Sequence, residues 1–170
     1  GMHDNIGKNV IYEESMRIPI FIYSKELEPR FDDELLYSLE DFYPTVMGLM
    51  GYSDLVPGSV QSRDLSSQIG GSRLDMPESQ LYMLYSQVDQ TGRNVDCGAR
   101  GLRDLRYSYV VKYDKGVVTC EELYDRQEDP SQLDNIVDRD LAVKARLRKQ
   151  LYQRLSEIDD PALDIIGGLL

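Results

Sequence analysis

The sequence has no tryptophan, a single histidine (His3) and only two cysteines, Cys97 and Cys120. A histidine-based zinc site or a Ser-His-Asp triad would have to use His3, so neither is expected. The two cysteines show neither a C-x-x-C pair nor the spacing of metal ligands, so they do not indicate a metal site. Their number neither implies nor excludes a disulfide.

The chain also lacks an excess of positive charge and any long apolar run. Its 19 basic and 30 acidic residues give a net charge of −11, whereas nucleic acid is bound through clustered Lys and Arg. No run approaches the roughly 18 apolar residues of a membrane span. The polar first residues lack the apolar core of a signal peptide. We therefore expect neither nucleic acid nor a membrane as a partner, and the compartment, periplasmic or cytoplasmic, stays open.

What is present is the composition of an ordinary globular chain. Of 170 residues, 41% are hydrophobic, with 13 Gly and 7 Pro, which suffices for one core or two small ones. Between residues 52 and 80 the composition turns to Gly, Ser, Pro and Asp, with Pro57-Gly58, Gly70-Gly71 and Pro77 as breakers. We predict a boundary near Met76, which divides the chain into residues 1–75 and 76–170.

The stretch from Lys8 to Tyr23 is the most distinctive part of the first segment. A polar approach runs into apolar residues of β-branched and aromatic type, which predicts a strand buried on both faces. Pro19 lacks a backbone donor and belongs to the first residues of that strand. A lysine in the loop before such a strand is well placed to hold an anion. The predicted strand comprises Ile18, Ile20, Phe21, Ile22 and Tyr23.

A helix is predicted from about Glu40 to Met50, with Ser38 as its N-cap and Gly51 beyond its C-terminus. Pro44 is tolerable there only within the first turn. The last third reads as strands over Leu81–Ser86, Ala99–Tyr113 and Val117–Leu123, with a hairpin turn at Asp114-Lys115-Gly116. A helix follows from about Asp138 to Ile158, and the tail 162–170 either docks or stays free. Its predicted buried stripe is Leu141, Ala145, Leu151, Tyr152, Leu155 and Ile158.

Several motifs resemble those of sulfatases of the alkaline-phosphatase superfamily. K-N-x-x-Y-E-E-S-x-R-I-P is similar to the segment after the family's second metal-ligand motif. S-L-E-D-F-Y-P-T-V-M-G-L-M-G and S-R-D-L are similar to a family helix and the step after it. R-G-L-R-D-L-R-Y-S-Y-V-V-K-Y and E-L-Y-D-R-Q-E-D-P-S-Q-L-D-N resemble two late family signatures. The resemblance implies that Lys8 contacts the sulfate ester, and that His3 stands where many members have a second histidine.

The fold class implied is α/β, the C-terminal part of an alkaline-phosphatase-like fold. It would comprise a buried strand and a helix from the large domain, then a small antiparallel sheet packed by a C-terminal helix. In the family a formylglycine, made from the first residue of C/S-x-P/A-x-R, attacks sulfur with the help of a cation, here Ca²⁺ or Mg²⁺. The nearest match, Cys97-Gly98-Ala99-Arg100-Gly101, has Gly101 in place of the arginine, and we reject it.

The metal ligands of the family come from an acidic pair near its N-terminus and a pair just upstream of the stretch seen here. Asp4-Asn5 lies too close to Lys8 to match the second pair. We expect no cofactor in this chain itself, with formylglycine and the cation belonging to the complete enzyme. The chain is thus predicted to be a sulfatase fragment, a sulfuric ester hydrolase by family, that is inactive alone.

Two other interpretations stay open. The chain can be a fragment of another alkaline-phosphatase-superfamily enzyme, a phosphodiesterase or phosphonate hydrolase, or a non-catalytic module that binds a glycan or a protein. For the complete enzyme we expect a sulfated small molecule or glycan as substrate, in a bacterial setting. An uncovered edge at the strand 18–23 predicts self-association into a homo-oligomer.

Overall fold

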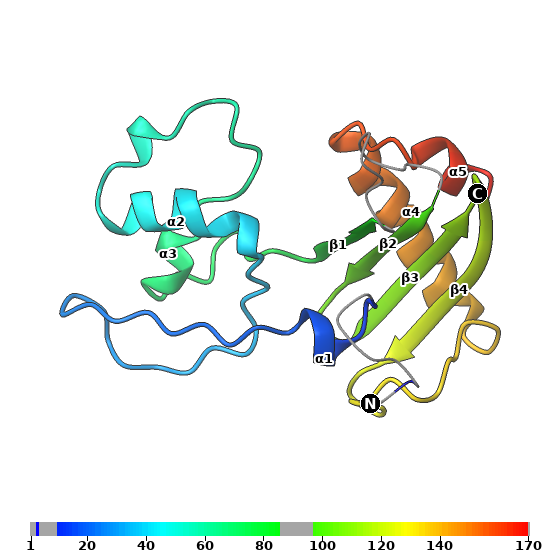
Figure 1. The fold of residues 1–170 in the computed structure, drawn as a ribbon. Coiled ribbons are helices and arrows are strands. Elements are labelled where there is room, and N and C mark those ends of the chain that lie inside the picture. Colours follow the sequence, from blue (N-terminus) through cyan, green and yellow to red (C-terminus); the bar gives the residue numbers. More distant parts are fainter. Residues whose placement is uncertain (1–2, 4–9, 86–96, 170) are drawn as a thin grey trace. The chain divides into compact units, whose positions relative to one another are not determined.

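The computed structural model describes residue 3, residues 10–85 and residues 97–169 (Figure 1). The chain divides into two compact units, one formed by Gly1–Ile18 together with Leu81–Leu170, the other by Pro19–Gln80. We call them the sheet unit and the helical unit. This division differs from the predicted segments 1–75 and 76–170, because the first residues pack with the late strands. None of the helices in the described part of the chain is long and apolar enough to cross a membrane.

The sheet unit contains four strands in the order β1-β2-β3-β4. They are β1 (Gln80–Tyr85), β2 (Gly98–Arg103), β3 (Tyr107–Asp114) and β4 (Val117–Asp125), and both β2–β3 and β3–β4 are antiparallel. The predicted strand over Ala99–Tyr113 is wrong as a single element, because the chain reverses at Asp104. The Asp104 carboxylate accepts hydrogen bonds from the amides of Arg106 (2.8 Å) and Tyr107 (2.5 Å), which stabilises the turn.

The second turn was predicted correctly. Only Lys115 and Gly116 separate β3 from β4, and both have positive φ, 51° and 72°. Two consecutive residues of positive φ form the tight hairpin turn whose backbone twist matches that of the flanking strands. Neighbouring side chains along these strands point to opposite faces of the sheet, apart from one irregularity in the β3–β4 register between Lys112 and Tyr113.

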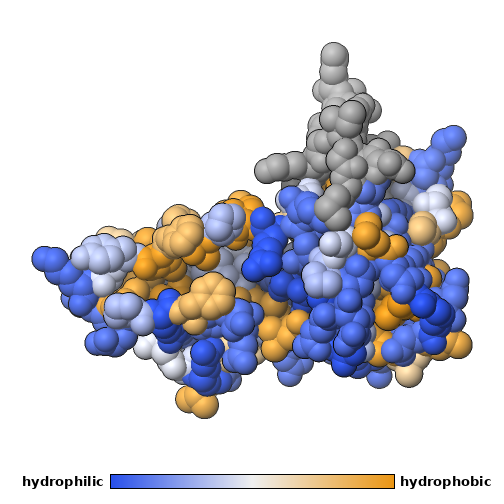
Figure 2. Space-filling view, turned by 90° about the horizontal axis from the view of Figure 1, so that it is seen from below, coloured by the Kyte–Doolittle hydropathy of each residue, from blue (hydrophilic) through white to orange (hydrophobic). Residues whose placement is uncertain are grey.

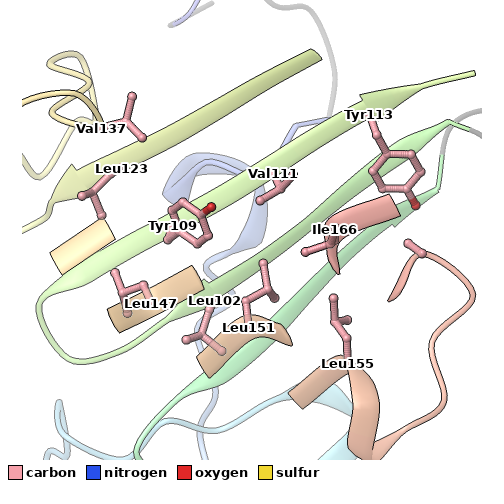
Figure 3. Packing of buried hydrophobic residues seen from close by; sticks show 11 residues of the cluster. Leu102, Tyr109, Val111, Tyr113, Leu123, Val137, Leu147, Leu151, Leu155 and Ile166 are labelled. Atoms are coloured by element: carbon pink, nitrogen blue, oxygen red, sulfur yellow. The ribbon is translucent and has the colours of Figure 1, made fainter. Parts of the chain in front are cut away.

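Helix α4 (Leu141–Glu157) lies across one face of the sheet (Figure 1), and Asp140 caps it by accepting from the Val143 amide at 3.1 Å. The predicted stripe is confirmed at Leu151 and Leu155, which are buried, but it is wrong at Leu141, which is 64% exposed, and it missed the buried Leu147. Helix α5 (Leu163–Gly167) places the buried Ile166 in the same core, so the tail docks. Figure 3 shows the packed residues: Leu147, Leu151 and Leu155 of α4 against Leu102, Tyr109 and Val111 of the strands.

The opposite face of the sheet is covered by the segment that contains Ile11 and Met16. Ile11 packs against Ala99 of β2 and Val110 of β3, and the short helix α1 (Glu13–Met16) follows directly. Val110 and Val111 illustrate the alternation, since the first contacts Ile11 and the second contacts the core under α4. The sheet is thus buried on both faces, once by a helix and once by the segment that contains the Y-E-E-S motif.

The helical unit contains η2 (Leu39–Asp41), α2 (Phe42–Leu49), η3 (Ser53–Leu55) and α3 (Ser66–Ile69). As predicted, Pro44 lies in the first turn of α2, and Gly51 follows the helix with φ 78°. The buried Asp41 carboxylate accepts from Arg63 at 2.7 Å, and also from the Arg63 amide at 2.9 Å. Two of the motifs, S-L-E-D and S-R-D-L, therefore contact each other through this pair.

The predicted buried strand 18–23 is wrong for this chain. Residues 17–24 form no strand, and the side chains of Phe21 and Tyr23 are 93% and 89% exposed. A strand needs neighbouring strands to pair its backbone groups, and none of the described residues supplies one here. Figure 2 shows apolar side chains at the surface of the helical unit. The exposed large hydrophobic residues of this unit include Phe31, Leu39, Met50, Leu55 and Leu74.

Candidate functional site

The candidate site is the stretch around His3 and residues 10–16, which contains the Y-E-E-S motif. Helix α1 begins after Tyr12, whose carbonyl accepts hydrogen bonds from the amides of Ser15 and Met16, both at 2.9 Å. Ile11 and Tyr12 are buried against the sheet. Two groups of polar residues hold Tyr12 and Glu13 in place, and both lie within the sheet unit.

The first group, here called the Glu13 cluster, consists of Glu13, Arg103, Arg126 and Gln132. The Glu13 carboxylate lies 2.9 Å from Arg103 Nε and 3.8 Å from Arg126 Nη1. The Glu13 amide donates to the buried Gln132 Oε1 at 2.7 Å. Both the backbone and the side chain of Glu13 are therefore held by late residues of the chain.

Burial determines the electrostatics of this cluster. Burial, and next the neighbouring Arg103, lower the pKa of Arg126, whereas Glu13 partly compensates. Burial also raises the pKa of the adjacent Tyr82 to about 12. Tyr82 therefore stays neutral near pH 7, and the cluster holds one carboxylate between two guanidinium groups. Such an arrangement binds and orients but is not suited to transfer a proton near neutrality.

The second group, the Tyr12 cluster, consists of His3, Tyr12, Lys112 and Glu122. The Tyr12 hydroxyl donates to Glu122 Oε1 at 3.3 Å, and Lys112 Nζ donates to the same oxygen. Lys112 Nζ also lies 5.3 Å from the centre of the Tyr12 ring. Burial alone would lower the pKa of Lys112, but the hydrogen bond to Glu122, the charge of Glu122 and the contact with Tyr12 together outweigh it, so the pKa is raised. Lys112 is therefore charged near neutrality and neutralises Glu122.

His3 belongs to this cluster through its ring. The His3 and Tyr12 rings are stacked, with centroids 3.8 Å apart and planes 9° from parallel. His3 Nε2 lies 3.9 Å from a carboxylate oxygen of Glu14. The structure thus brings His3, one of the two predicted site residues, onto the motif segment. Lys8, the other, lies outside the described residues, and its role stays a prediction.

No set of three or more His, Cys, Asp or Glu side chains among the described residues could hold a metal ion. The described residues therefore do not fit the Ca²⁺ or Mg²⁺ implied by the resemblance, and no step is assigned to a cation here. Cys97 and Cys120 are both free thiols. Cys97 precedes β2 and bonds to Asp114, so it has a local partner within the sheet unit.

The sequence did not predict Arg103, Arg126, Lys112, Glu122 or Gln132 as parts of the site. One signal was available for two of them. Lys112 is a charged position among the mostly aromatic and β-branched residues of β3, and Glu122 is one of two adjacent carboxylates in β4. A buried charge is retained only with a partner. The partner itself was not evident, because Tyr12 lies 100 and 110 positions away from them in the chain.

The four-stranded sheet, the helix across it and the motif segment on its other face match the C-terminal domains of sulfatases in the alkaline-phosphatase superfamily. The chain belongs to the family described as “N-sulphoglucosamine sulphohydrolase, C-terminal”, which matches residues 1–160. The predicted family and fold class are thereby confirmed.

Known proteins agree with this assignment. The chain is 33% identical over 164 residues to an endo-4-O-sulfatase of Bacteroides thetaiotaomicron, covering 91% of this chain and 32% of that protein. It matches the crystal structure of the “putative sulfatase yidJ” from Bacteroides fragilis with a TM-score of 0.84 and 34% identity, covering 96% of this chain and 34% of the other.

A more distant match shows the fold alone. Phosphonate monoester hydrolase of Agrobacterium radiobacter has a TM-score of 0.59 and 20% identity, with 72% of this chain and 25% of that one covered. The chain spans about a third of the length of the sulfatases that it matches. The activity, substrates and partners of a whole sulfatase are therefore proposals for this chain.

Proposed function

We propose that this chain forms the C-terminal part of a sulfuric ester hydrolase that acts on a sulfated glycan or a smaller sulfate ester. The family match over residues 1–160 is the observation that carries the proposal. The contacts support it, because the Y-E-E-S, R-G-L-R and E-L-Y-D-R motifs meet in the Glu13 cluster through Glu13, Arg103 and Arg126.

Within that enzyme, Lys8 is the residue that contacts the sulfate ester, and His3 assists it. A positive charge there would stabilise the charge that develops on the sulfate oxygens in the transition state. The 170 residues contain no C/S-x-P/A-x-R motif, so we assign the formylglycine to other polypeptide. The same holds for the ligands of the Ca²⁺ or Mg²⁺ cation. The chain by itself is then inactive toward sulfate esters.

A chimera tests this proposal. The last third of the B. thetaiotaomicron endo-4-O-sulfatase is replaced with this chain, and sulfate release is measured on that enzyme's own substrate. We expect release by the chimera and none by this chain alone. Lys8→Ala should lower kcat by at least about 100-fold, as expected for losing one group that stabilises an oxyanion. Lys115→Ala, in the exposed hairpin turn, is the matched control and should change nothing.

A folded chimera that releases no sulfate would contradict the sulfatase assignment, and release by this chain alone would show an unrecognised site. The fold shared with a phosphonate monoester hydrolase keeps that second activity open. The gene upstream distinguishes the two, because C/S-x-P/A-x-R indicates a sulfatase and a bare Thr or Ser in its place indicates phosphatase-like chemistry. Binding of a sulfated glycan without turnover, retained in Lys8→Ala, would favour a non-catalytic module.

For the isolated chain we propose self-association of two copies through residues 18–23. The exposure of Ile18, Phe21 and Tyr23 supports it, since an extended apolar segment without a neighbour pairs readily with another chain. Light scattering should show a species larger than a monomer, and Phe21→Lys should shift the population toward the monomer. Leu133→Lys, at another exposed apolar residue, is the control. A monomer at high concentration would refute the proposal.

A further inference from the structure

We infer that the four-stranded sheet acts as a positioning platform for His3 and residues 10–16, with Glu13 and Glu122 as its positioning residues. This inference rests on the proposed function for its catalytic consequence, but its structural part stands on described contacts. In this proposal the sheet not only completes the fold but also positions the motif segment. Its face opposite α4 holds the buried Tyr12 and the Glu13 side chain, which is 14% exposed.

The Glu13 cluster immobilises one residue from three directions. Arg103 comes from the end of β2, Arg126 follows β4, and Gln132 lies in the loop before α4. The side chains of Glu13, Arg103 and Arg126 are all at least four-fifths buried. Hydrogen bonds to a charged partner in such surroundings are stronger than those at an exposed surface. The cluster therefore restrains both the direction of the backbone and the side chain at position 13.

The Tyr12 cluster extends this restraint toward the start of the chain. Glu122 holds the Tyr12 hydroxyl, and the Tyr12 ring in turn stacks on His3. Contacts therefore connect Glu122 of β4 through Tyr12 to His3, the residue that we propose assists catalysis. Lys112 contributes by neutralising Glu122, which would otherwise be a buried charge without compensation.

Replacing each of two adjacent carboxylates in β4 distinguishes an effect on the position of the motif segment from an effect on stability. Glu122 faces the motif segment, where it bonds to Tyr12 and Lys112. Glu121 faces α4, where it accepts from Arg148 at 2.6 Å and pairs with Lys144 at 3.0 Å. Both replacements, Glu122→Gln and Glu121→Gln, remove a negative charge from the same strand and break an ion pair. Only the first should change the motif segment.

The single histidine makes the structural part directly measurable. In the untagged 170-residue chain only His3 contributes imidazole resonances to a proton NMR spectrum. Stacking on Tyr12 shifts these resonances upfield, and Tyr12→Leu should return them to the position of an unstacked ring. We expect Glu122→Gln and Glu13→Gln to move them in the same direction. Glu121→Gln should lower the melting temperature and leave them in place.

If Glu121→Gln shifts the His3 resonances as much as Glu122→Gln does, general destabilisation explains the effect and the inference fails. It also fails if neither Glu13→Gln nor Glu122→Gln shifts them. These outcomes do not depend on any enzymatic activity, so they are separate from the fate of the proposed function.

The catalytic consequence is measured in the sulfatase chimera. Misplacing a reacting group by about 1 Å can cost on the order of 100-fold in rate, so Glu13→Gln should lower kcat by roughly 10- to 100-fold. KM should change little, because the substrate contacts themselves are kept. Glu121→Gln should leave both constants unchanged. An unaltered kcat in Glu13→Gln would overturn the positioning role, whereas an inactive parent chimera would overturn the proposed function instead.

Discussion

The buried ion pair between Arg100 and Asp160 offers the sharpest test of how the sheet unit is held together. The Arg100 side chain is 0% exposed and that of Asp160 is 2% exposed, with Nε 3.0 and 3.1 Å from the two carboxylate oxygens. Asp160 also accepts from the Ala162 amide at 2.8 Å, at the entrance to α5. Asp160→Ala would therefore remove the Asp160 counter-charge from a buried guanidinium and a bond that orients α5.

Breaking a buried pair by removing one partner costs about 3–5 kcal/mol. That is a large part of the total stability of a domain of this size, which is about 5–15 kcal/mol. With a urea dependence of about 1–3 kcal/mol per molar, the unfolding midpoint should fall by at least about 1 M. Urea titration followed by far-UV circular dichroism measures this shift.

Two further variants define the control and the refutation. Asp138→Ala removes a carboxylate that is 90% exposed and should change stability by less than about 0.5 kcal/mol. Arg100→Leu combined with Asp160→Ala removes both charges and should be less destabilised than Asp160→Ala alone. The reasoning is refuted if Asp160→Ala loses less than about 1 kcal/mol, or if the double variant is no more stable than the single one.

Three other predictions concern the same unit. Leu151→Ala, at the centre of the core under α4, should cost about 2–5 kcal/mol in urea unfolding, and a loss similar to that of an exposed leucine would contradict the packing. Burial would raise the pKa of Glu121, but bonds from Tyr109, Arg148 and Lys144 outweigh it and lower the pKa below 4.5. Its stabilisation is therefore present above about pH 4.5 and lost as the pH falls through the lowered value. Glu121→Gln should accordingly reduce stability at pH 7 and flatten the decline toward pH 3, and equal declines would disprove this. Lys115→Asn should add up to about 1 kcal/mol, because Asn tolerates positive φ better, and a decrease would count against the turn assignment.

Local features were predictable from the sequence, whereas features that need a distant partner were not. Gly51 after α2 and Gly116 in the hairpin turn were predicted correctly, because each depends on a few adjacent residues. The strand expected over residues 18–23 failed because pairing depends on a neighbour that local composition cannot reveal. The stripe of α4 was predicted correctly at Leu151 and Leu155. It was wrong at its start, because Leu141 and Leu147 are equally apolar and only the sheet beneath the helix distinguishes them.

The candidate site shows the same limit. The motif resemblance led to His3 and to the Y-E-E-S stretch, but not to the residues that bind them. The bonds from Arg103, Tyr12 and Glu13 join positions 90, 110 and 119 apart in the chain. A pattern of short period contains no information about such pairs. What a single sequence can indicate is that a charged residue within a mostly apolar and aromatic strand requires a partner, as Lys112 of β3 does.

The route of the chain determines how the protein responds to proteolysis and to truncation. The chain leaves the sheet unit at Ile18 and returns at Leu81, so Pro19–Gln80 lie between two parts of one packed body. A protease that cleaves at the exposed Phe21 would produce two peptides. These should elute together in gel filtration and separate only in denaturant, because Ile11 stays packed against Ala99 and Val110. A shortened version starting at residue 81 would instead expose that apolar surface to water and should precipitate on expression.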